Sequence, residues 1–296
     1  MTSTELFPGF TTHRIQTSGA ELRCVVGGEG PPLLMLHGYP QTHVIWHKVA
    51  PALAHQYTVV CADLRGYGDS SKPASDAAHT PYSKRAMALD MVELMGDLGY
   101  DRFRLVGHDR GGRVAHRLCL DHPQAVERVA VLDISPTRIM YGKTDQGFAT
   151  AYYHWFFLIQ PFDLPERLIG ANPKFYLHWK LGGWGSAGTS FFDPRAMAEY
   201  ERCFAHTETI RATCEDYRAA ASIDLEHDAA DASRRIECPL LVLWGEKGIV
   251  NRYFKPLADW LSVATDVRGK TLPCGHYLAE ERPEETLAEL RTFLAD

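Results

Sequence analysis

"LVGHDRGGRV", residues 105–114, is the stretch that decides the fold. An apolar run ends at Val106, and a turn follows in which Asp109 stands between Gly107 and Gly111. This Gly-x-nucleophile-x-Gly pattern is typical of a sharp strand-to-helix turn that exposes its central side chain at the top of a sheet. The flanking glycines allow the strand and the helix to pack closely. The alternative is an ordinary turn in which Asp109 only caps the following helix.

Strands and helices alternate on both sides of this turn. Short apolar runs end in Gly, Asp or Ser and alternate with amphipathic runs, which predicts repeated strand-helix units in a mostly parallel sheet. We expect strands at 21–28, 32–38, 57–64, 103–109, 128–135, 239–246 and around 267–273. We expect helices at 43–55, 84–99, 112–122, 254–262 and 283–296. The fold class is therefore α/β, with helices on both faces of an open sheet whose ligand lies beyond the strand carboxyl ends.

The character of the sequence changes after Pro136. Residues 137–235 are rich in Tyr, Trp, Phe and His, carry helix-like periods and contain no convincing strand. We interpret this segment as a helical insertion that covers the carboxyl end of the sheet. The expected organisation is a core domain, formed by residues 1–136 and 236–296, with a helical cap domain formed by residues 137–235.

Composition and charge narrow the classes of partner. The chain has 296 residues, 45% of them hydrophobic, and a net charge of -6, which gives no basic field to attract nucleic acid or an anionic membrane. The N-terminal residues lack the apolar run of a secretory signal, and no later stretch reaches membrane-spanning length. We therefore expect a cytoplasmic protein with a small-molecule substrate and without nucleic-acid or membrane partners.

Cysteine and histidine usage argues against a disulfide framework and a metal site. The seven cysteines are scattered singly without a C-x-x-C pair, which is typical of reduced thiols in the cytosol. The stretch "HVIWH", residues 43–47, has the i, i+4 histidine spacing of a zinc helix, but Val44 stands where such helices carry a glutamate. We expect neither a metal nor a cofactor.

An aspartate at the turn predicts attack on a saturated carbon. The free N–H groups at the start of the following helix favour an ionised carboxylate on Asp109. A serine attacking saturated carbon would leave an ether that water cannot readily cleave. A carboxylate needs no base to displace a leaving group, and it gives an ester that water can hydrolyse. The sequence thus predicts alkyl transfer to Asp109 followed by hydrolysis of the ester.

The hydrolysis step needs a base and a group that orients it. His276 lies between the last expected strand and the last helix, where this architecture places its catalytic histidine. Asp133 in "VLDIS" ends the strand after the turn and is assigned as the acid that orients the imidazole. Its alternative role is to cap the chain where the insertion begins. Glu246 is a weaker candidate for the acid, because Gly248 stands where an acid is expected after the next strand.

Backbone donors and two arginines flank the predicted nucleophile. The N–H groups of Tyr39, after the stretch "LLMLHG", and of Arg110 are expected to stabilise the tetrahedral intermediate of ester cleavage. Arg110 and Arg113 lie three apart on the first turn of a helix, so that their guanidinium groups share one face and suit a small substrate carboxylate. The alternative for both arginines is a surface salt bridge.

Motifs spread over nearly the whole chain carry a resemblance to a known family. They are "MLHGYPQTHVIWHKVAPALA" (35–54), "ADLRGYGDS" (62–70), "GHDRGGRV" (107–114), "LDISPT" (132–137), "YHWFFLIQP" (153–161), "CEDYRAA" (214–220), "DLEHD" (224–228) and "CGHY" (274–277). On these motifs the chain resembles the α/β-hydrolase superfamily and, within it, the haloacetate or fluoroacetate dehalogenases. Haloalkane dehalogenases and many epoxide hydrolases have a similar turn, but they place Trp where this chain has Arg110.

The resemblance implies a halide site in the insertion. In the resembled family the residues matching His154, Trp155 and Tyr217 donate hydrogen bonds to the departing halide, and a tryptophan matching Trp184 lines the same cavity. Donors aimed at a departing fluoride stabilise the transition state more than the ground state. The alternative for these aromatic residues is ordinary packing within the cap. Tyr39 departs from the family, which more often has Phe there, and this leaves the substrate range open.

Together these expectations predict hydrolysis of a 2-haloacetate to glycolate and halide. The resembled family is often dimeric, so a homodimer is a further expectation. The nearest alternative is an epoxide hydrolase, because Tyr152, Tyr153 and Tyr217 offer acids that protonate a ring oxygen. A catalytically idle receptor for a small acid is an alternative of another class, and the apparently complete set of nucleophile, acid and base argues against it.

Overall fold

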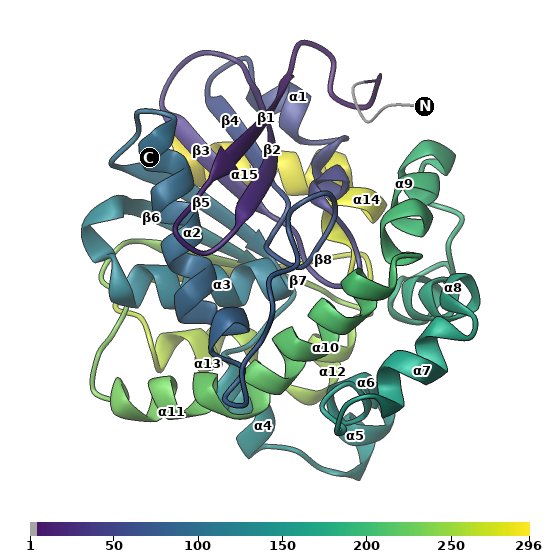
Figure 1. The fold of residues 1–296 in the computed structure, drawn as a ribbon. Helices are drawn as coiled ribbons and strands as arrows, with labels where there is room; N and C mark the ends of the chain where they lie inside the picture. Colours follow the sequence, from purple (N-terminus) through teal and green to yellow (C-terminus); the bar gives the residue numbers. More distant parts are fainter. Residues whose placement is uncertain (1–4) are drawn as a thin grey trace.

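The central feature of the fold is an eight-stranded, mostly parallel sheet. A computed structural model describes residues 5–296 (Figure 1). The strands are β1 (Thr11–Gln16), β2 (Glu21–Gly27), β3 (Pro32–Leu36), β4 (Thr58–Ala62), β5 (Phe103–His108), β6 (Val126–Leu132), β7 (Leu240–Gly245) and β8 (Val267–Leu272). Their spatial order is β1-β2-β4-β3-β5-β6-β7-β8. The β1–β2 and β2–β4 pairs are antiparallel, and all later pairs are parallel, which confirms the predicted α/β fold class.

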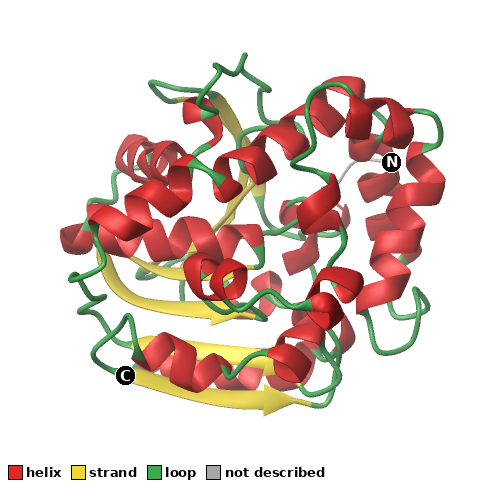
Figure 2. Ribbon diagram, turned by 90° about the horizontal axis from the view of Figure 1, so that it is seen from below, coloured by secondary structure: helices red, strands yellow, loops and turns green. Residues whose placement is uncertain are grey.

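All strands expected from the sequence are present, and β1 is an addition to them. In β1 only Ile15 is buried, because the strand lies at the edge of the sheet and most of its side chains face solvent. Such an edge strand carries no continuous apolar run, so its sequence gives a weak signal. In contrast, all residues of β4 are buried, since helices cover both faces of the sheet at its centre (Figure 2).

Helices of the core flank the sheet. They are α1 (Ala50–Leu53), α2 (Lys84–Asp97), α3 (Arg110–Asp121), α12 (Ile249–Tyr253), α13 (Pro256–Leu261), α14 (Leu278–Glu281) and α15 (Pro283–Ala295), with 3₁₀ turns at His43–Trp46, Thr80–Tyr82 and Pro123–Ala125. The prediction of one helix over 43–55 is wrong, because a 3₁₀ turn and the separate α1 occupy it. Pro51 explains the break: it has no N–H to bond the carbonyl of His47, and its ring would clash there.

The regular elements of the segment interpreted as a cap are all helices. They are α4 (Thr137–Gly142), α5 (Gln146–Ala151), α6 (His154–Phe157), α7 (Leu164–Gly170), α8 (Pro173–Trp184), α9 (Pro194–Phe204), α10 (Thr207–Ala221) and α11 (Ile223–Ala230). Helices α5 to α9 gather at one side of the molecule, away from β1 and β2 (Figure 1). Residues 137–235 contain no strand. This arrangement supports the division into a core and a cap, which stays our interpretation.

The carboxyl ends of the parallel strands meet at one edge of the sheet and bring distant loops together. Gly38 and Tyr39 follow β3, Asp109 follows β5, Asp133 follows β6 and the loop with His276 follows β8. These loops come from positions far apart in the chain, but parallel neighbours place them side by side. The edge is therefore the place to look for a site.

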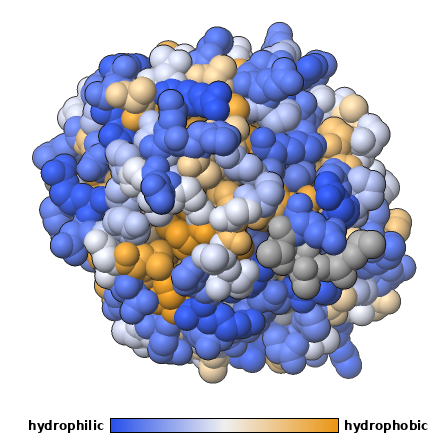
Figure 3. Space-filling view, turned by 90° about the horizontal axis from the view of Figure 1, so that it is seen from above, coloured by the Kyte–Doolittle hydropathy of each residue, from blue (hydrophilic) through white to orange (hydrophobic). Residues whose placement is uncertain are grey.

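The face of the molecule seen in Figure 3 is mainly polar. Viewed from above, hydrophilic residues cover most of the face and apolar ones gather in limited areas (Figure 3). Such scattered apolar surface is normal for a folded domain. None of the helices in residues 5–296 combines the length and the apolar character needed to cross a lipid bilayer.

Candidate active site

Asp109 occupies a strained turn between β5 and α3. Its backbone has φ 47° and ψ -113°, a conformation that non-glycine residues rarely adopt. A Cβ on Gly107 would lie 2.6 Å from the carbonyl oxygen of Gly111, and one on Gly111 would lie 2.5 Å from that of His37. Both positions therefore exclude a side chain. Strain of this kind persists where the surrounding structure enforces it, as functional sites commonly do.

The Asp109 carboxylate is buried and held as an acceptor. Its side chain makes no capping hydrogen bond to α3, so the alternative in which it only caps that helix is wrong. The backbone N–H of Tyr39 donates to Oδ1 at 2.9 Å. Burial acts to raise the pKa of Asp109, but the charges of His276 and Arg113 outweigh it and hold this pKa below its ordinary value. The carboxylate is therefore ionised at neutral pH.

His276 and Asp133 form a buried pair. Nδ1 of His276 and Oδ2 of Asp133 lie 2.6 Å apart, and the N–H of Gly245 donates to the other carboxylate oxygen at 3.0 Å. Nε2 of His276 is buried without a hydrogen-bond partner, so it is free to take a proton from a water molecule. Burial acts to lower the pKa of His276, but the Asp133 carboxylate outweighs it and the pKa is raised.

The geometry does not place Glu246 beside the imidazole. Glu246 is exposed after β7, whereas Asp133 contacts the ring directly. A Cβ on Gly248 would lie 3.2 Å from Oδ1 of Asp133, so this glycine packs against the pair. The N–H of His276 also donates to the carbonyl oxygen of Trp184 at 2.9 Å, which ties the loop after β8 to helix α8.

Arg110 is fixed by a buried acid that the sequence reasoning missed. Its Nε and Nη2 donate to the two carboxylate oxygens of Asp216 at 2.8 and 2.7 Å, and its Nη1 remains buried without a partner. Tyr67 donates to the same carboxylate at 2.6 Å, and Lys84 forms an ion pair with it. Burial acts to raise the pKa of Asp216, but Arg110 and Lys84 keep it well below its usual range. The sequence feature that could have identified Asp216 is its place in "CEDYRAA", one residue before Tyr217.

Arg113 lies on the same face of α3 and keeps one free donor. Its Nη1 donates to the carbonyl oxygen of Ser135 at 3.1 Å and to Oγ1 of Thr137 at 2.9 Å. Its Nε is buried without a partner. Neither Arg110 nor Arg113 is a surface residue, so the alternative of a surface salt bridge is wrong for both. Each guanidinium thus retains an unpaired N–H inside the molecule.

The aromatic residues predicted for halide binding lie together above the arginines. The guanidinium carbon of Arg110 is 4.2 Å from the ring centre of Tyr217, and that of Arg113 is 4.7 Å from the ring of Trp155. The ring centres of His154 and Tyr217 are 5.5 Å apart. The hydroxyl of Tyr217, Nε1 of Trp155 and Nδ1 of His154 are all buried without a hydrogen-bond partner. An unsatisfied buried donor costs about 1–3 kcal/mol, so this cluster is suited to a bound acceptor.

Trp184 and Tyr39 complete the wall between this cluster and the imidazole. The ring of Trp184 is 4.5 Å from that of His154 and 5.5 Å from that of His276. The ring of Tyr39 packs 5.2 Å from that of Tyr217. Burial keeps the pKa of His154 well below its ordinary value, so this ring is neutral.

Tyrosines named for the epoxide hydrolase alternative and one further histidine lie at or near the site. Tyr152 is buried 5.0 Å from the ring of His154, whereas Tyr153 is 38% exposed and covers Lys180 instead. Of the three tyrosines named for the epoxide hydrolase alternative, Tyr152 and Tyr217 are therefore buried near His154, and Tyr153 is not. Nε2 of His108 donates to the backbone carbonyl of His276 at 2.8 Å, and burial lowers the pKa of His108 to about 3, so a neutral ring fixes the loop. Sequence reasoning missed this residue.

No metal cluster accompanies these groups in the part of the chain that the structure describes. No set of three or more His, Cys, Asp or Glu side chains within residues 5–296 is arranged to hold an ion. The groups assembled at the site are thus one carboxylate, a histidine–acid pair, two arginines and several unpaired N–H and O–H donors.

Comparisons with known proteins identify the fold and the family of the chain. Residues 31–283 match a family model described as the alpha/beta hydrolase fold. The chain is 47% identical to a fluoroacetate dehalogenase from Burkholderia sp over 98% of this chain and 96% of the relative. It is 34% identical to a soluble epoxide hydrolase from Corynebacterium sp. (strain C12), over 96% of this chain and 97% of the relative.

A solved structure extends the similarity. A protein from Nostoc sp PCC 7120, assigned to the alpha/beta hydrolases, superposes with a TM-score of 0.95 at 61% identity, over 96% of this chain and 98% of the other. The family model spans most of the sequence, and the Burkholderia relative matches nearly all of it. The chain therefore belongs to the α/β-hydrolase superfamily and, within it, to the fluoroacetate dehalogenase family.

Proposed function

We propose that this enzyme hydrolyses 2-haloacetates, namely fluoroacetate, chloroacetate or bromoacetate, to glycolate and halide. The observation that carries the proposal is the buried, ionised Asp109 beside the His276–Asp133 pair, under a wall of unpaired donors. The 47% identical Burkholderia relative, a fluoroacetate dehalogenase, supports this assignment. The chain is thus a hydrolase that acts on carbon–halide bonds.

In the first step, an oxygen of Asp109 attacks the carbon that bears the halogen. The new bond forms as the carbon–halogen bond breaks, and the bonding electrons leave with the halide. The product is a glycolyl ester on Asp109. Attack by one anion on another is opposed by repulsion, and the guanidinium groups of Arg110 and Arg113 offset it when they bind the substrate carboxylate through their unpaired N–H groups.

The departing halide gathers negative charge where the cap supplies donors. His154, Trp155 and Tyr217 present unpaired groups there, and Trp184 closes the side toward the imidazole. Because these donors meet full charge only as the bond breaks, they lower the barrier more than they strengthen substrate binding. Each is worth roughly 2–4 kcal/mol by comparison with oxyanion-hole donors.

In the second step, His276 activates water against the ester. Nε2 takes a proton from water while Asp133 stabilises the imidazolium through Nδ1, and the hydroxide attacks the carbonyl carbon of the Asp109 ester. The N–H groups of Tyr39 and Arg110 stabilise the tetrahedral oxyanion. Its collapse releases glycolate and restores the Asp109 carboxylate. The steps use side chains and water only.

One turnover in heavy-oxygen water tests the covalent route. Hydroxide adds to the side-chain carbon of Asp109, so the label is expected in that carboxylate, and the first glycolate is expected without label. Peptide mass spectrometry locates the labelled residue. Label that enters glycolate directly, with Asp109 unlabelled, overturns the mechanism.

The same enzyme preparation separates this function from the alternatives. An epoxide hydrolase turns over styrene oxide and leaves haloacetates intact, and an idle receptor binds them without releasing halide. A halide-release panel over fluoroacetate, chloroacetate, bromoacetate and 2-chloropropionate also measures the substrate range. We expect release from the haloacetates to exceed diol formation from styrene oxide.

Assembly and location complete the proposal. A homodimer is supported by large apolar side chains that helices α7 and α8 and the preceding loop expose, namely Phe162, Leu164, Leu168, Phe175 and Trp179. Sedimentation is expected to give twice the chain mass, and Trp179→Lys is expected to give the monomer. A cytoplasmic location is supported by the seven cysteines, none of which forms a disulfide in the structure.

A further inference from the structure

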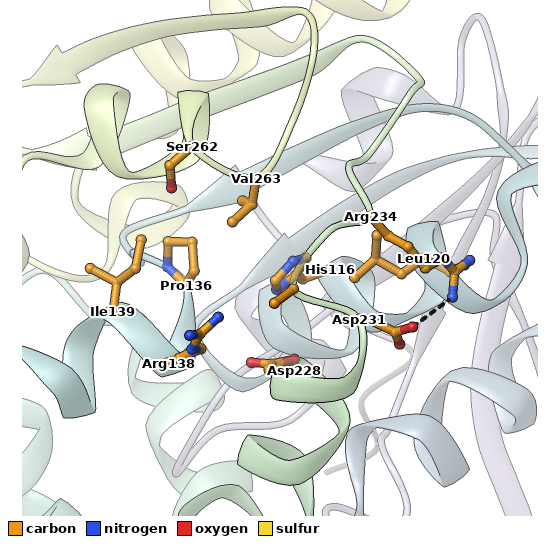
Figure 4. Close-up of a pocket in the computed structure, with 11 residues that line it drawn as sticks. His116, Leu120, Pro136, Arg138, Ile139, Asp228, Asp231, Arg234, Ser262 and Val263 are labelled. Atoms are coloured by element: carbon orange, nitrogen blue, oxygen red, sulfur yellow. Dashed lines mark hydrogen bonds and ion pairs between the residues drawn. The ribbon is translucent and has the colours of Figure 1, made fainter.

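A second cavity lies beside the C-terminal half of helix α3, further along the helix than the arginine pair. It has a volume of about 260 Å³ and lies where α3, the start of α4, the end of α11 and the loop after α13 converge. Figure 4 shows side chains from all four segments around one space. Its size is below the usual range of roughly 300–1,000 Å³ for drug-sized sites, so it suits a small molecule.

Three polar side chains reach this cavity with hydrogen-bonding capacity unused. His116 is 8% exposed, its ring centre lies 5.2 Å from that of Trp260, and neither ring nitrogen has a hydrogen-bond partner within residues 5–296. Arg138 makes no hydrogen bond or ion pair in that part of the chain. The carboxylate of Asp228 accepts no hydrogen bond there, and its nearest cation is Nη1 of Arg117 at 3.9 Å. These three groups line the cavity and bond no other protein group there, so their hydrogen-bonding capacity is available to a ligand in the cavity.

The rest of the lining determines what kind of ligand fits. Leu120, Pro136 and Val263 give the cavity an apolar side (Figure 4). The free cation of Arg138 suits a carboxylate, and the imidazole of His116, whose pKa burial lowers to about 3, donates as a neutral ring. The carboxyl of Asp228 suits a donor such as an ammonium group. Opposite charges on the cavity wall match a ligand that carries both.

We propose that this cavity binds a free α-amino acid with an apolar side chain. Its carboxylate pairs with Arg138 and accepts from His116, its ammonium group pairs with Asp228, and its side chain packs on Leu120, Pro136 and Val263. A zwitterion leaves the charge balance of the cavity unchanged. No residue of this cavity belongs to the proposed reaction.

The cavity borders the segment that positions Arg113, the arginine proposed to bind the substrate carboxylate. Pro136 lines the cavity, and the next residue, Thr137, accepts the hydrogen bond from Nη1 of Arg113. Arg113 and His116 also share helix α3. A ligand that holds Arg138 in place therefore restrains the segment that positions Arg113. The expected consequence is a change in KM for fluoroacetate when the cavity is filled.

Calorimetric titration of the full-length enzyme with L-leucine tests the proposal. We expect saturable binding to the wild type and an affinity at least tenfold weaker in Arg138→Gln and in Asp228→Asn. Arg211→Gln is the matched control, because Arg211 lines a different cavity, and it is expected to bind leucine like the wild type. Arg138 is exposed, so its replacement is expected to leave folding intact, which the thermal midpoint checks.

Two analogues test the zwitterion requirement, and kinetics test the connection. Isovalerate lacks the ammonium group and isopentylamine lacks the carboxylate, so each is expected to bind at least tenfold more weakly than leucine. Leucine is expected to change KM for fluoroacetate in the wild type and not in Arg138→Gln. The absence of saturable leucine binding, an unchanged affinity in Arg138→Gln, or equal binding of isovalerate each overturns the site. A constant KM overturns its connection to Arg113.

Discussion

The two halves of the candidate site differ in how their polar atoms are satisfied. On the core side, Asp109 accepts from the N–H of Tyr39, and Asp133 accepts from the N–H of Gly245. Asp133 also bonds His276, and the charge of His276 lowers the pKa of Asp109 while the charge of Asp133 raises the pKa of His276. On the cap side, Trp155 and Tyr217 bury an N–H and an O–H that bond nothing. The core residues have permanent partners before substrate arrives, except at Nε2 of His276, whereas the donors of the cap half find a partner only when an acceptor arrives.

The core residues thus carry out the bond-forming steps, whereas the cap donors stabilise the negative charge of the departing halide. A nucleophile and a base need fixed protonation states before substrate binds, so they depend on permanent partners. Donors for a leaving group act best when they find an acceptor only in the transition state, so they remain unpaired beforehand. The following predictions test this division.

The largest effect is expected from the core nucleophile. Asp109→Asn removes the anionic oxygen that attacks carbon, so halide release is expected to fall by roughly 10⁴-fold or more, as for removal of a nucleophile in related catalytic sets. Initial rates of fluoride release measure this, after mass spectrometry has excluded deamidation back to Asp. Halide loss at the wild-type rate would contradict the covalent mechanism.

A slightly smaller loss is expected from the base, with a different signature. His276→Gln leaves the first step intact but removes the group that activates water, so steady turnover is expected to fall by roughly 10³–10⁴-fold. One equivalent of halide should still appear in a burst. The intact protein should then carry the mass of a glycolyl ester, and its absence would place His276 in the first step.

On the cap side, removal of one donor should weaken the reaction by less. Trp155→Phe keeps a ring but deletes Nε1–H, and a loss of roughly 10²-fold in kcat for fluoroacetate is expected, with little change in KM. The loss should be smaller for bromoacetate, since bromide carries a more diffuse charge. Trp46→Phe is the matched control, because Trp46 is buried with an equally unpaired Nε1 but contacts none of the site rings.

The pH dependence should separate the two core steps by about tenfold per pH unit below the pKa of His276. This pKa is raised, so ester hydrolysis, which needs the neutral ring, is lost as pH falls through a value above 6.5. The pKa of Asp109 is lowered, so the halide burst should persist through the same range. Rapid-quench measurement of both phases tests this, and a burst that declines together with turnover would contradict the assignment.

The smallest effect concerns stability. Tyr217→Phe removes a buried hydroxyl that has no partner, so the free energy of unfolding is expected to stay constant or rise by about 1 kcal/mol, although activity falls. Tyr200→Phe is the contrast, because the hydroxyl of Tyr200 donates to Glu280 at 2.6 Å, and its loss is expected to cost about 1–3 kcal/mol. Urea denaturation measures both, and equal losses would show that the Tyr217 hydroxyl is paired in the free enzyme.

Local patterns made part of the site predictable. Asp109 lies in a turn whose glycines are visible in the sequence, and His276 and Asp133 follow strands that end in recognisable residues. Asp216 was missed because its role depends on Arg110, which lies 106 residues away in the chain. His108 was missed because a histidine inside a strand shows nothing of the loop that it bonds. Edge strand β1 was missed because its polar residues carry no burial signal.

The sequence by itself determined the fold class and the type of chemistry, since alternating strand and helix patterns and a carboxylate between two glycines are local properties. Only the tertiary structure decided which polar atoms stay unpaired inside the cap, how Asp216 fixes Arg110, and that a second cavity lies beside the C-terminal half of α3. The reason is that burial and hydrogen-bond satisfaction depend on contacts between segments far apart in the chain, which close only when the whole molecule packs.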